Sequence, residues 1–194
     1  MDIVLATKNP AKRRELEAFL AEVAPRVHVV ANLDWDDVDE TGDTFEANAI
    51  LKAAAVHETT GLAALADDSG LEVDALGGAP GVHSARFAGV DGDGADLANN
   101  ALLLERMSGV ADRQCRFRCV IAIVGDGLCE TVSGVAEGTL RHEAAGAGGF
   151  GYDPLFEPLG WKRTFGEVTP SEKATVSHRA LALRSASELL GRLT

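Results

Sequence analysis

The sequence predicts an α/β protein in which a long mixed sheet carries helices on its faces and forms two lobes around a cleft. An apolar run at residues 3–6 leads directly into a segment of helical periodicity, the pattern of a strand–helix unit. A strand-like run at 117–124 is followed by Asp126-Gly127, a two-residue hairpin signal, and by a second strand to Ala136. An antiparallel hairpin beside strand–helix units implies a mixed sheet, and 194 residues with 46% hydrophobic content suffice for one such domain.

The composition limits the class of protein and of partner. The formal net charge of -12 makes the surface repel DNA, RNA and anionic membranes, so neither a nucleic acid nor a membrane is expected as a partner. A small anionic substrate would therefore need a local basic pocket or a metal ion. No apolar run approaches the ~20 residues of a membrane span, and no signal-peptide pattern is visible. Three cysteines, an odd and small number, favour free thiols in a reducing cytoplasm.

The first strand–helix unit carries polar side chains at the amino end of its helix. Asn9 suits the N-cap and Pro10 the first helical position. One apolar helix face follows, formed by Leu16, Phe19, Leu20 and Val23. Backbone N–H groups, the positive end of the helix dipole and two lysines form a candidate phosphate cradle there, made of Thr7, Lys8, Asn9 and Lys12. An ordinary capped helix is the alternative, because the Walker pattern is absent.

The next segment is acidic and leads into a second helix. A strand is expected over Val27–Val30, and the acids of the exposed loop after it, one of which could turn inward as a metal ligand, are Asp34, Asp36, Asp37, Asp39, Glu40 and Asp43. Asp43 with Glu46 predicts a capping box that starts a helix through about His57. Its expected core face consists of Ala47, Ile50, Leu51 and Ala54. Asn48 and Lys52 share a different face, where such a pair is usually solvated but would meet phosphate if it faced a cleft.

Two adjacent carboxylates follow a short apolar run at residues 63–66. The run predicts a buried strand, and Ser69-Gly70 after the carboxylates predicts a turn. Ligands of α/β sheets bind at the carboxyl ends of strands, and neighbouring carboxylates repel each other unless a cation or a proton separates them. Because Mg2+ often joins carboxylates to phosphates, we expect Asp67 and Asp68 to hold Mg2+ beside a polyphosphate. For this motif alone, a solvated turn is the more common explanation.

Three further features lie between residues 86 and 119. Arg86, in a turn-rich stretch, is either a bidentate phosphate ligand or a surface arginine. A helix that ends near Ser108-Gly109 has its apolar side formed by Leu97, Ala101 and Leu104. Cys115 and Cys119 lack partners with zinc-site spacing and are expected to be small core residues.

The stretch from Ala145 to Phe156 is too rich in glycine for a regular element. Its glycines let the backbone approach a ligand closely, and Phe150 is expected either to stack on a base or to plug the core. His178 and Arg179 then open a last helix, where cations oppose the helix dipole, a local conflict typical of functional sites. The buried face of this helix is expected to consist of Ala182, Ala186, Leu189, Leu190 and Leu193.

Several separated stretches match one family pattern in the same order. They are Ala6-Thr7-Lys8-Asn9 through Lys12, Thr44 through Ala53, Ala66 through Gly70 with Gly77 through Gly81, Gly148 through Pro154, Glu172-Lys173, and Ser177-His178-Arg179. From Val4 to Leu190 the chain therefore resembles the inosine/xanthosine triphosphate pyrophosphatase family of house-cleaning nucleotide hydrolases. No single motif is decisive, but the ordered set is very specific.

The resemblance implies a reaction. It implies a Mg2+-dependent attack of water on the α-phosphorus of a non-standard purine triphosphate (ITP, dITP or XTP), which releases the monophosphate and pyrophosphate. It also implies a single domain over residues 1–194 with a central nucleotide-binding cleft, and a homodimer. As the charge of pyrophosphate develops, Mg2+, Lys12, Lys52 and the first helix N-terminus would offset it. Donors such as Arg179 and Lys173 would pair with the C6 oxygen of hypoxanthine or xanthine and leave adenine mismatched.

The resemblance also assigns individual residues. Asp68 matches the family's proton acceptor and one metal ligand, and Glu40 matches the other acidic ligand. The phosphate side is matched by Thr7, Lys8, Asn9, Lys12 and Ser69, and the base side by Phe150, Gly151, Tyr152, Asp153, Lys173, His178 and Arg179. Lys8 stands where many members have glycine or another small polar residue. Further candidates from the residues themselves are Asp67, Asn48, Lys52 and Arg86.

Three rival functions have distinct tests. A pyrophosphatase for pyrimidine or modified triphosphates would differ in a panel of ITP, XTP, dUTP and standard triphosphates. A catalytically silent nucleotide-binding protein would release no pyrophosphate with Mg2+, although Glu40, Asp68 and Lys12 speak against it. A nucleic-acid-binding protein would show strong salt-dependent binding to DNA, which the acidity disfavours.

Overall fold

Helices and strands alternate along most of the chain in the computed structural model, which describes residues 1–193 apart from the side chains of Ala11, Arg192 and Leu193. The helices are α1 (Pro10–Val23), α2 (Phe45–Thr60), α3 (Ala95–Arg106), α4 (Pro170–Val176) and α5 (His178–Leu193). The strands are β1 (Asp2–Leu5), β2 (His28–Val29), β3 (Ala63–Val73), β4 (Gln114–Gly125), β5 (Leu128–Leu140) and β6 (Phe156–Pro158).

These six strands form one mixed sheet in the order β2-β1-β3-β4-β5-β6. Strand β1 pairs in parallel with β2 and β3, whereas β5 and β6 are antiparallel. Strands β4 and β5 are neighbours joined by Asp126-Gly127, and Gly127 has the positive φ of 67° that the hairpin turn requires. The predicted fold class, a mixed sheet with helices on its faces, is confirmed.

The chain divides into two compact units. Unit 1 comprises residues 1–68, 119–134 and 181–194, and unit 2 comprises residues 69–118 and 135–180. The boundary in β3 falls between Asp68 and Ser69, so consecutive residues of one strand belong to different units.

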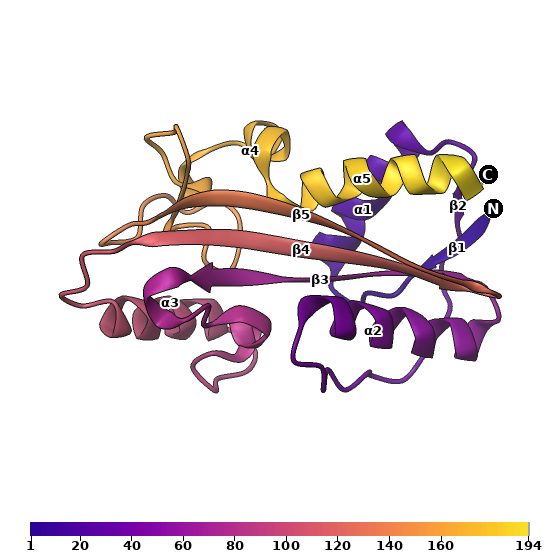
Figure 1. Ribbon diagram of the computed structural model, residues 1–194, viewed down its shortest axis with the longest axis horizontal. Helices are drawn as coiled ribbons and strands as arrows, with labels where there is room; N and C mark the ends of the chain where they lie inside the picture. The colour runs from indigo at the N-terminus through magenta and orange to yellow at the C-terminus, as the bar shows by residue number, and fades with distance from the viewer. Residues whose placement is uncertain (194) are drawn as a thin grey trace. The chain divides into compact units, whose positions relative to one another are not determined.

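Unit 1 has a core between its strands and two helices. In this unit α1 and α5 lie on one side of the strands and α2 on the other (Figure 1). The predicted apolar faces of α1 and α5 are confirmed, because Leu16, Leu20, Leu189 and Leu190 are buried with β1 and the unit 1 part of β4. Of the predicted α5 face, the side chain of Leu193 lies outside the described residues.

Unit 2 has its own, aromatic-rich core. Phe117, Phe156 and Phe165 pack with ring centroids 4.7–6.2 Å apart, together with Leu71 of β3 and Leu103 of α3. Helices α3 and α4 lie on opposite sides of the strands in this unit (Figure 1). Cys115 and Cys119 are 1% and 0% exposed, one in each unit, which confirms them as core residues.

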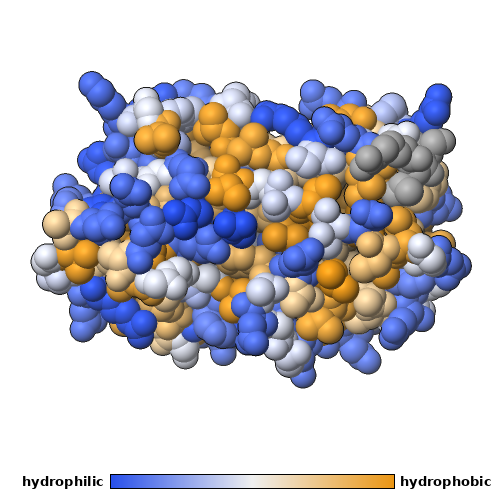
Figure 2. All heavy atoms as spheres, viewed as in Figure 1, coloured by the Kyte–Doolittle hydropathy of each residue, from blue (hydrophilic) through white to orange (hydrophobic). Residues whose placement is uncertain are grey.

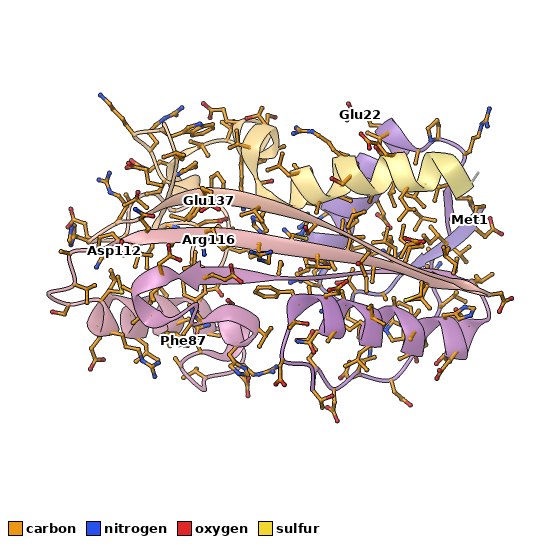
Figure 3. All side chains as sticks on the ribbon, in the orientation of Figure 1. Met1, Glu22, Phe87, Asp112, Arg116 and Glu137 are labelled. Carbon is orange, nitrogen blue, oxygen red and sulfur yellow. The ribbon has the colours of Figure 1, made fainter. Side chains whose placement is uncertain are left out.

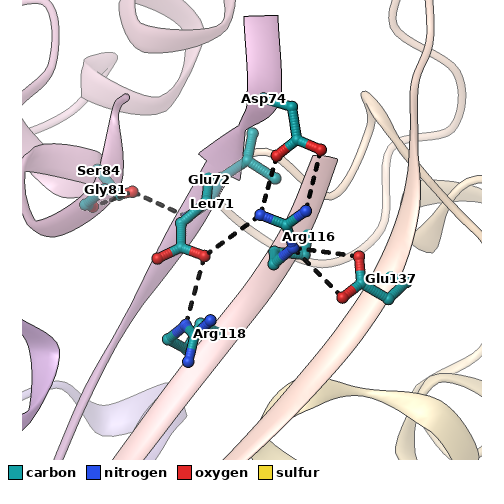
Figure 4. A network of polar contacts seen from close by, with 8 residues as sticks. All are labelled: Leu71, Glu72, Asp74, Gly81, Ser84, Arg116, Arg118 and Glu137. Carbon is teal, nitrogen blue, oxygen red and sulfur yellow. Dashed lines mark hydrogen bonds and ion pairs between the residues drawn. The ribbon is translucent and has the colours of Figure 1, made fainter. Parts of the chain in front are cut away.

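An ion-pair network ties three strands of unit 2 together. Arg116 of β4 and Glu137 of β5 lie side by side (Figure 3), with 3.1 Å between Nε and Oε2. The guanidinium of Arg116 also contacts Asp74 at 2.9 Å, while Arg118 contacts Glu72 at 3.3 Å (Figure 4). Because these groups are partly solvated, each pair contributes only ~0–1 kcal/mol, and the network mainly fixes the register of the strands.

The predicted turn at Ser69-Gly70 is wrong. Strand β3 runs without interruption through both aspartates and this dipeptide to Val73. Since successive side chains of a strand point to opposite faces, Asp67 and Asp68 are directed apart. The mutual repulsion expected for two carboxylates in a turn is thereby reduced.

Gly70 instead marks a close approach of another segment to β3. A Cβ there would collide with the hydroxyl of Ser84 and would lie 2.5 Å from the carbonyl oxygen of Gly81. The Ser84 hydroxyl donates to Gly81 at 2.6 Å and accepts from the N–H of Leu71 at 2.9 Å (Figure 4). The strand therefore needs a residue without a side chain at this position.

Gly70→Ala is expected to destabilise the protein by ~1–3 kcal/mol, because the new methyl group overpacks a site closed by backbone. The measurement is urea unfolding. The matched control is Gly125→Ala in β4, where the nearest atom to a new Cβ, the Cβ of Ala63, would be 3.4 Å away. Equal stability of the two variants would contradict the argument.

Two helix predictions also need correction. The N-cap of α2 is Thr44, whose hydroxyl accepts from the N–H of Ala47, and not Asp43. Glu46 accepts instead from the Thr131 hydroxyl at 2.7 Å.

The predicted buried faces of α2 and α3 are also wrong. The buried residues of α2 are Phe45, Asn48, Ala49, Ala53 and Val56, while Leu51 is exposed. The buried residues of α3 are Asn99, Asn100 and Leu103, while Leu97 is 77% exposed. In both helices, polar residues with hydrogen-bond partners occupy part of the buried face.

No helix of residues 1–193 is long and apolar enough to cross a membrane. On the face shown in Figure 2, hydrophilic residues line much of the margin, and apolar residues are mixed with hydrophilic ones across the middle.

Candidate active site

The β1–α1 connection of unit 1 forms as the sequence predicts. Asn9 caps α1, with its side-chain oxygen accepting from the N–H of Lys12 at 3.2 Å, and the Thr7 hydroxyl accepts from the N–H of Asn9 at 3.2 Å. Lys8 reaches to the acidic loop, where its ammonium lies 2.7 Å from Asp37. Since the Asp37 side chain is 91% exposed, this pair is a surface contact in water.

Lys12 and Asp67 form a pair deeper in unit 1. The ammonium of Lys12 lies 3.2 Å from Asp67 Oδ2, and the Asp67 side chain is 1% exposed. Lys12 comes from the first turn of α1 and Asp67 from the middle of β3. The pairing places a lysine of the predicted phosphate cradle against the strand that carries the aspartates.

The other aspartate, Asp68, belongs to a second cluster of unit 1. The ammonium of Lys52 lies 3.0 Å from Asp68 Oδ1 and 2.7 Å from Glu40 Oε1, so that it bridges two carboxylates. Asn48, one helical turn before Lys52, donates to Asp68 at 3.4 Å and accepts from the N–H of Gly42 at 2.7 Å. We call Glu40, Asn48, Lys52 and Asp68 the carboxylate–lysine cluster.

Burial and charge determine the protonation of this cluster. Burial raises the pKa of Asp68 above its usual value, although the attraction of Lys52 opposes the rise. Burial lowers the pKa of Lys52, but the charge of Asp68 and the hydrogen bond to Glu40 outweigh it, so that the pKa of Lys52 is raised. Lys52 is therefore an ammonium at neutral pH, and it compensates part of the carboxylate charge.

The donor set of the cluster fits a hard divalent cation. Two carboxylates from different segments already share one cation, the Lys52 ammonium. Mg2+ typically takes one or two carboxylates and completes its shell with water and substrate phosphates. Among residues 1–193, no group of three or more His, Cys, Asp or Glu side chains could hold a metal. Glu40 and Asp68 would therefore hold Mg2+ together with phosphate oxygens rather than in an all-protein cage.

Unit 2 gathers the aromatic and basic candidates. Phe150 is 38% exposed, whereas Tyr152 and Asp153 in the same loop are 3% and 2% exposed. Asp153 Oδ2 accepts from the N–H of Phe150 at 2.9 Å and from the ammonium of Lys173 at 2.5 Å. The Lys173 nitrogen lies 4.8 Å and the Arg179 guanidinium carbon 5.7 Å from the Phe150 ring centroid. Two cations thus border one presented ring.

Short helix α4 explains how Lys173 is positioned. Thr169 and Glu172 form a capping box at its start, and hydrogen bonds from Thr169 and Arg163 lower the pKa of Glu172 to about 2. Lys173 follows Glu172 in this first turn and is 9% exposed. The cap therefore fixes the turn that directs Lys173 to Asp153.

The first two residues of α5, His178 and Arg179, have different surroundings in unit 2. Arg179 is 3% exposed and donates to the hydroxyl of Ser69 at 3.1 Å. The ring of His178 stacks on Phe117 at 4.7 Å between centroids, which makes it part of the unit 2 core. Tyr152 is likewise buried, and its hydroxyl donates to the Ser84 carbonyl oxygen at 2.9 Å. Arg86, at the end of a 3₁₀ helix (Gly81–Arg86), is exposed.

The structure adds two residues that sequence reasoning missed. Asp96 and Asn100 of α3 both bind the backbone of Gly151, at 2.7 and 2.9 Å. They lie four residues apart and therefore share one helix face. The sequence gives no signal for them, because α3 carries further polar residues, among them Asn99, Glu105 and Arg106.

In total, two groups of candidates are brought together. Unit 1 joins Lys12 to Asp67, and Lys52 to Glu40, Asn48 and Asp68. Unit 2 joins Phe150, Asp153, Lys173 and Arg179, and links Arg179 to Ser69. Ser69 directly follows Asp68 in β3.

A protein-family model decides the classification, because the model described as the Ham1 family matches residues 3–189. The chain belongs to the Ham1 family. Among its relatives, a Desulforamulus reducens protein named dITP/XTP pyrophosphatase is 50% identical over 197 residues and covers 100% of this chain and 97% of its own length. The predicted family resemblance is confirmed.

Solved structures of other members share the architecture of this Ham1-family chain. The Staphylococcus aureus Ham1 protein has a TM-score of 0.90 at 35% identity, with 100% of both chains covered. A structure from Mycobacterium abscessus, described as nucleoside-triphosphatase / dITP/XTP pyrophosphatase, has a TM-score of 0.79 at 44% identity and covers 96% of this chain and 98% of its own. These matches support the α/β architecture independently of sequence periodicity.

Proposed function

We propose that this protein is a nucleoside triphosphate pyrophosphatase that hydrolyses ITP, dITP and XTP to the monophosphate and pyrophosphate. The single observation that carries the proposal is the carboxylate–lysine cluster of unit 1, found in a chain whose relatives are named dITP/XTP pyrophosphatase. Removal of non-standard purine triphosphates from the nucleotide pool is the corresponding role.

In the proposed reaction, unit 1 handles the triphosphate. Thr7, Lys8, Asn9 and Lys12 bind phosphate oxygens at the start of α1, where the helix dipole and two ammonium groups compensate negative charge. Glu40 and Asp68 would hold Mg2+, which would supply Lewis-acid polarisation of the α-phosphate when bound. Asp68 orients the attacking water and accepts its proton. Lys52 compensates charge on the departing pyrophosphate.

Unit 2 handles the base in this proposal. Phe150 offers a partly exposed ring for stacking, and Lys173 and Arg179 border it as cationic donors. Hypoxanthine and xanthine present an acceptor oxygen at C6, whereas adenine presents an amino donor there. A buried donor that meets a donor is left unpaired, which penalises adenine. His178, whose ring stacks on Phe117, and Tyr152, whose hydroxyl donates to the Ser84 carbonyl oxygen, stay assigned to the base side.

A substrate panel with pyrophosphate detection tests the proposed function. We expect pyrophosphate release from ITP, dITP and XTP at rates well above those for ATP and dUTP, and loss of release when EDTA replaces Mg2+. Rapid hydrolysis of dUTP would instead support the pyrimidine-directed alternative. Nucleotide binding without any turnover would support the silent binding protein.

We also propose a cytoplasmic homodimer. The cytoplasmic location rests on the cysteine content and on nucleotides being the substrate, and the dimer rests on the family resemblance. Light scattering of the purified chain tests the dimer, which a mass near 20.3 kDa would contradict.

A further inference from the structure

Helix α3 carries none of the residues predicted to bind nucleotide, yet it holds the loop that presents Phe150. The Asp96 carboxylate accepts from the N–H of Gly151 at 2.7 Å, and the Asn100 amide donates to the carbonyl oxygen of the same residue at 2.9 Å. Both contacts connect positions more than 50 residues apart in sequence, at separations of 55 and 51. One face of α3 therefore forms hydrogen bonds with both peptide groups that flank the Gly151 Cα.

These bonds act on the backbone immediately beside Phe150. The N–H of Gly151 belongs to the peptide plane between Phe150 and Gly151, so Asp96 fixes that plane. The N–H of Phe150 belongs to the preceding plane, and Asp153 fixes it at 2.9 Å. With both planes that flank the Phe150 Cα held, the direction of its Cα–Cβ bond is determined.

The local sequence shows that this conformation is imposed. Gly151 has a φ of 59° and Gly149 a φ of 74°, values that residues with side chains rarely adopt. A Cβ on Gly149 would collide with the Asp153 carboxylate, whereas a Cβ on Gly151 would meet nothing within 4 Å. Gly151 is therefore required by its backbone angle alone, and a residue of such freedom needs external bonds to stay in one conformation.

We propose that Asp96, supported by Asn100, is a positioning residue for purine recognition: it fixes the Gly151 peptide and thereby directs the Phe150 side chain toward the position at which the base stacks. The inference rests on the proposed function, because it deepens the assignment of Phe150 to the base side. Asp96 is suited to a test because it is exposed, whereas truncation of buried Asn100 would leave the Gly151 carbonyl oxygen without its partner.

The experiment measures ligand binding by calorimetry with IMP, which carries the base, and with pyrophosphate and Mg2+, which do not. We expect Asp96→Ala to lower the affinity for IMP about tenfold and to leave the affinity for pyrophosphate unchanged. Without the Asp96 hydrogen bond, part of the binding free energy of IMP is used to order the loop. Asp96→Asn is expected to retain IMP affinity, because an amide oxygen still accepts the Gly151 N–H. Asp93→Ala, in the exposed loop before α3, is the matched control for loss of an acid.

Hydrogen exchange of the Phe150–Gly151 segment supplies a second readout. Faster exchange in Asp96→Ala than in Asp96→Asn supports the proposal. Both variants lose the negative charge at the start of α3, so an effect of that charge alone would change exchange equally in the two. Only asparagine keeps an acceptor for the Gly151 N–H. Equal IMP affinity and equal exchange in wild type and Asp96→Ala would overturn it. If wild type binds no IMP and hydrolyses no ITP, the proposed function has failed as well, which distinguishes that outcome from failure of the Asp96 role alone.

Discussion

Asp68→Asn is expected to lower kcat/KM for ITP by about 10³-fold while the protein remains folded. The carboxylate is assigned two functions, proton acceptor for the water and ligand of Mg2+, and the amide can perform neither well. Stability should change little, because burial disfavours the charged form of Asp68 and raises its pKa, whereas its loss deprives the Lys52 ammonium of one of its two carboxylate partners and leaves Glu40. Steady-state kinetics with pyrophosphate detection and a thermal melt measure the two effects.

The control for Asp68→Asn is Asp74→Asn. Asp74 follows the same strand, but its carboxylate pairs with Arg116 in the ion-pair network of unit 2. It should retain wild-type kcat/KM. A titration with Mg2+ separates the two roles of Asp68: loss of the ligand raises the Mg2+ concentration needed for half-maximal rate, whereas loss of the proton acceptor alone does not. Activity of Asp68→Asn within about threefold of wild type would remove Asp68 from both roles.

The fold could be predicted best where the two faces of a segment differ clearly in hydrophobicity or where a turn signal is specific. Helix α1 and the β4–β5 hairpin were predicted well, because large apolar residues recur at one spacing and Asp126-Gly127 is specific for a tight turn. The face of α2 was predicted wrongly because the helix is rich in alanine on every side, so its periodicity carries little contrast. Its N-cap had two adjacent candidates, Asp43 and Thr44, and only the structure distinguishes them.

Strand β3 shows a different limit. Asp-Asp-Ser-Gly has the composition of a turn, and local propensity favoured that interpretation. In the structure, Lys12 and Lys52 neutralise the two aspartates separately, and pairing with β1 and β4 keeps the strand extended. Long-range pairing therefore overrode the local preference.

The contacts of the candidate site could not be predicted, and its assignment to these residues stays a prediction. The ordered motifs identified Glu40, Lys52 and Asp68, yet nothing in the sequence indicated that one ammonium bridges both carboxylates. The role of α3 was also hidden, since Asp96 and Asn100 act on a glycine more than 50 residues away through backbone groups. Contacts of this kind leave no periodic or compositional trace.

Arg179→Ala is expected to reduce the preference for ITP over ATP by about 10- to 100-fold, the equivalent of one hydrogen bond from a charged donor. Arg179 is 3% exposed, donates to Ser69 and lies beside the Phe150 ring, so its guanidinium is held in place before any base arrives. In the proposed complex it donates to the C6 oxygen of hypoxanthine. The amino group of adenine offers that donor no acceptor, so removal of Arg179 should lower kcat/KM for ITP much more than for ATP.

Two further variants keep this test independent of folding. Arg184→Ala removes an exposed arginine from the same helix and should leave the ITP/ATP ratio unchanged. Arg179→Lys keeps the positive charge but loses the planar fork of donors, so the ratio should be intermediate if geometry matters and near wild type if charge alone matters. An unchanged ratio in a folded Arg179→Ala protein would leave Lys173, which pairs with Asp153 beside the same ring, as the remaining donor able to read the C6 oxygen.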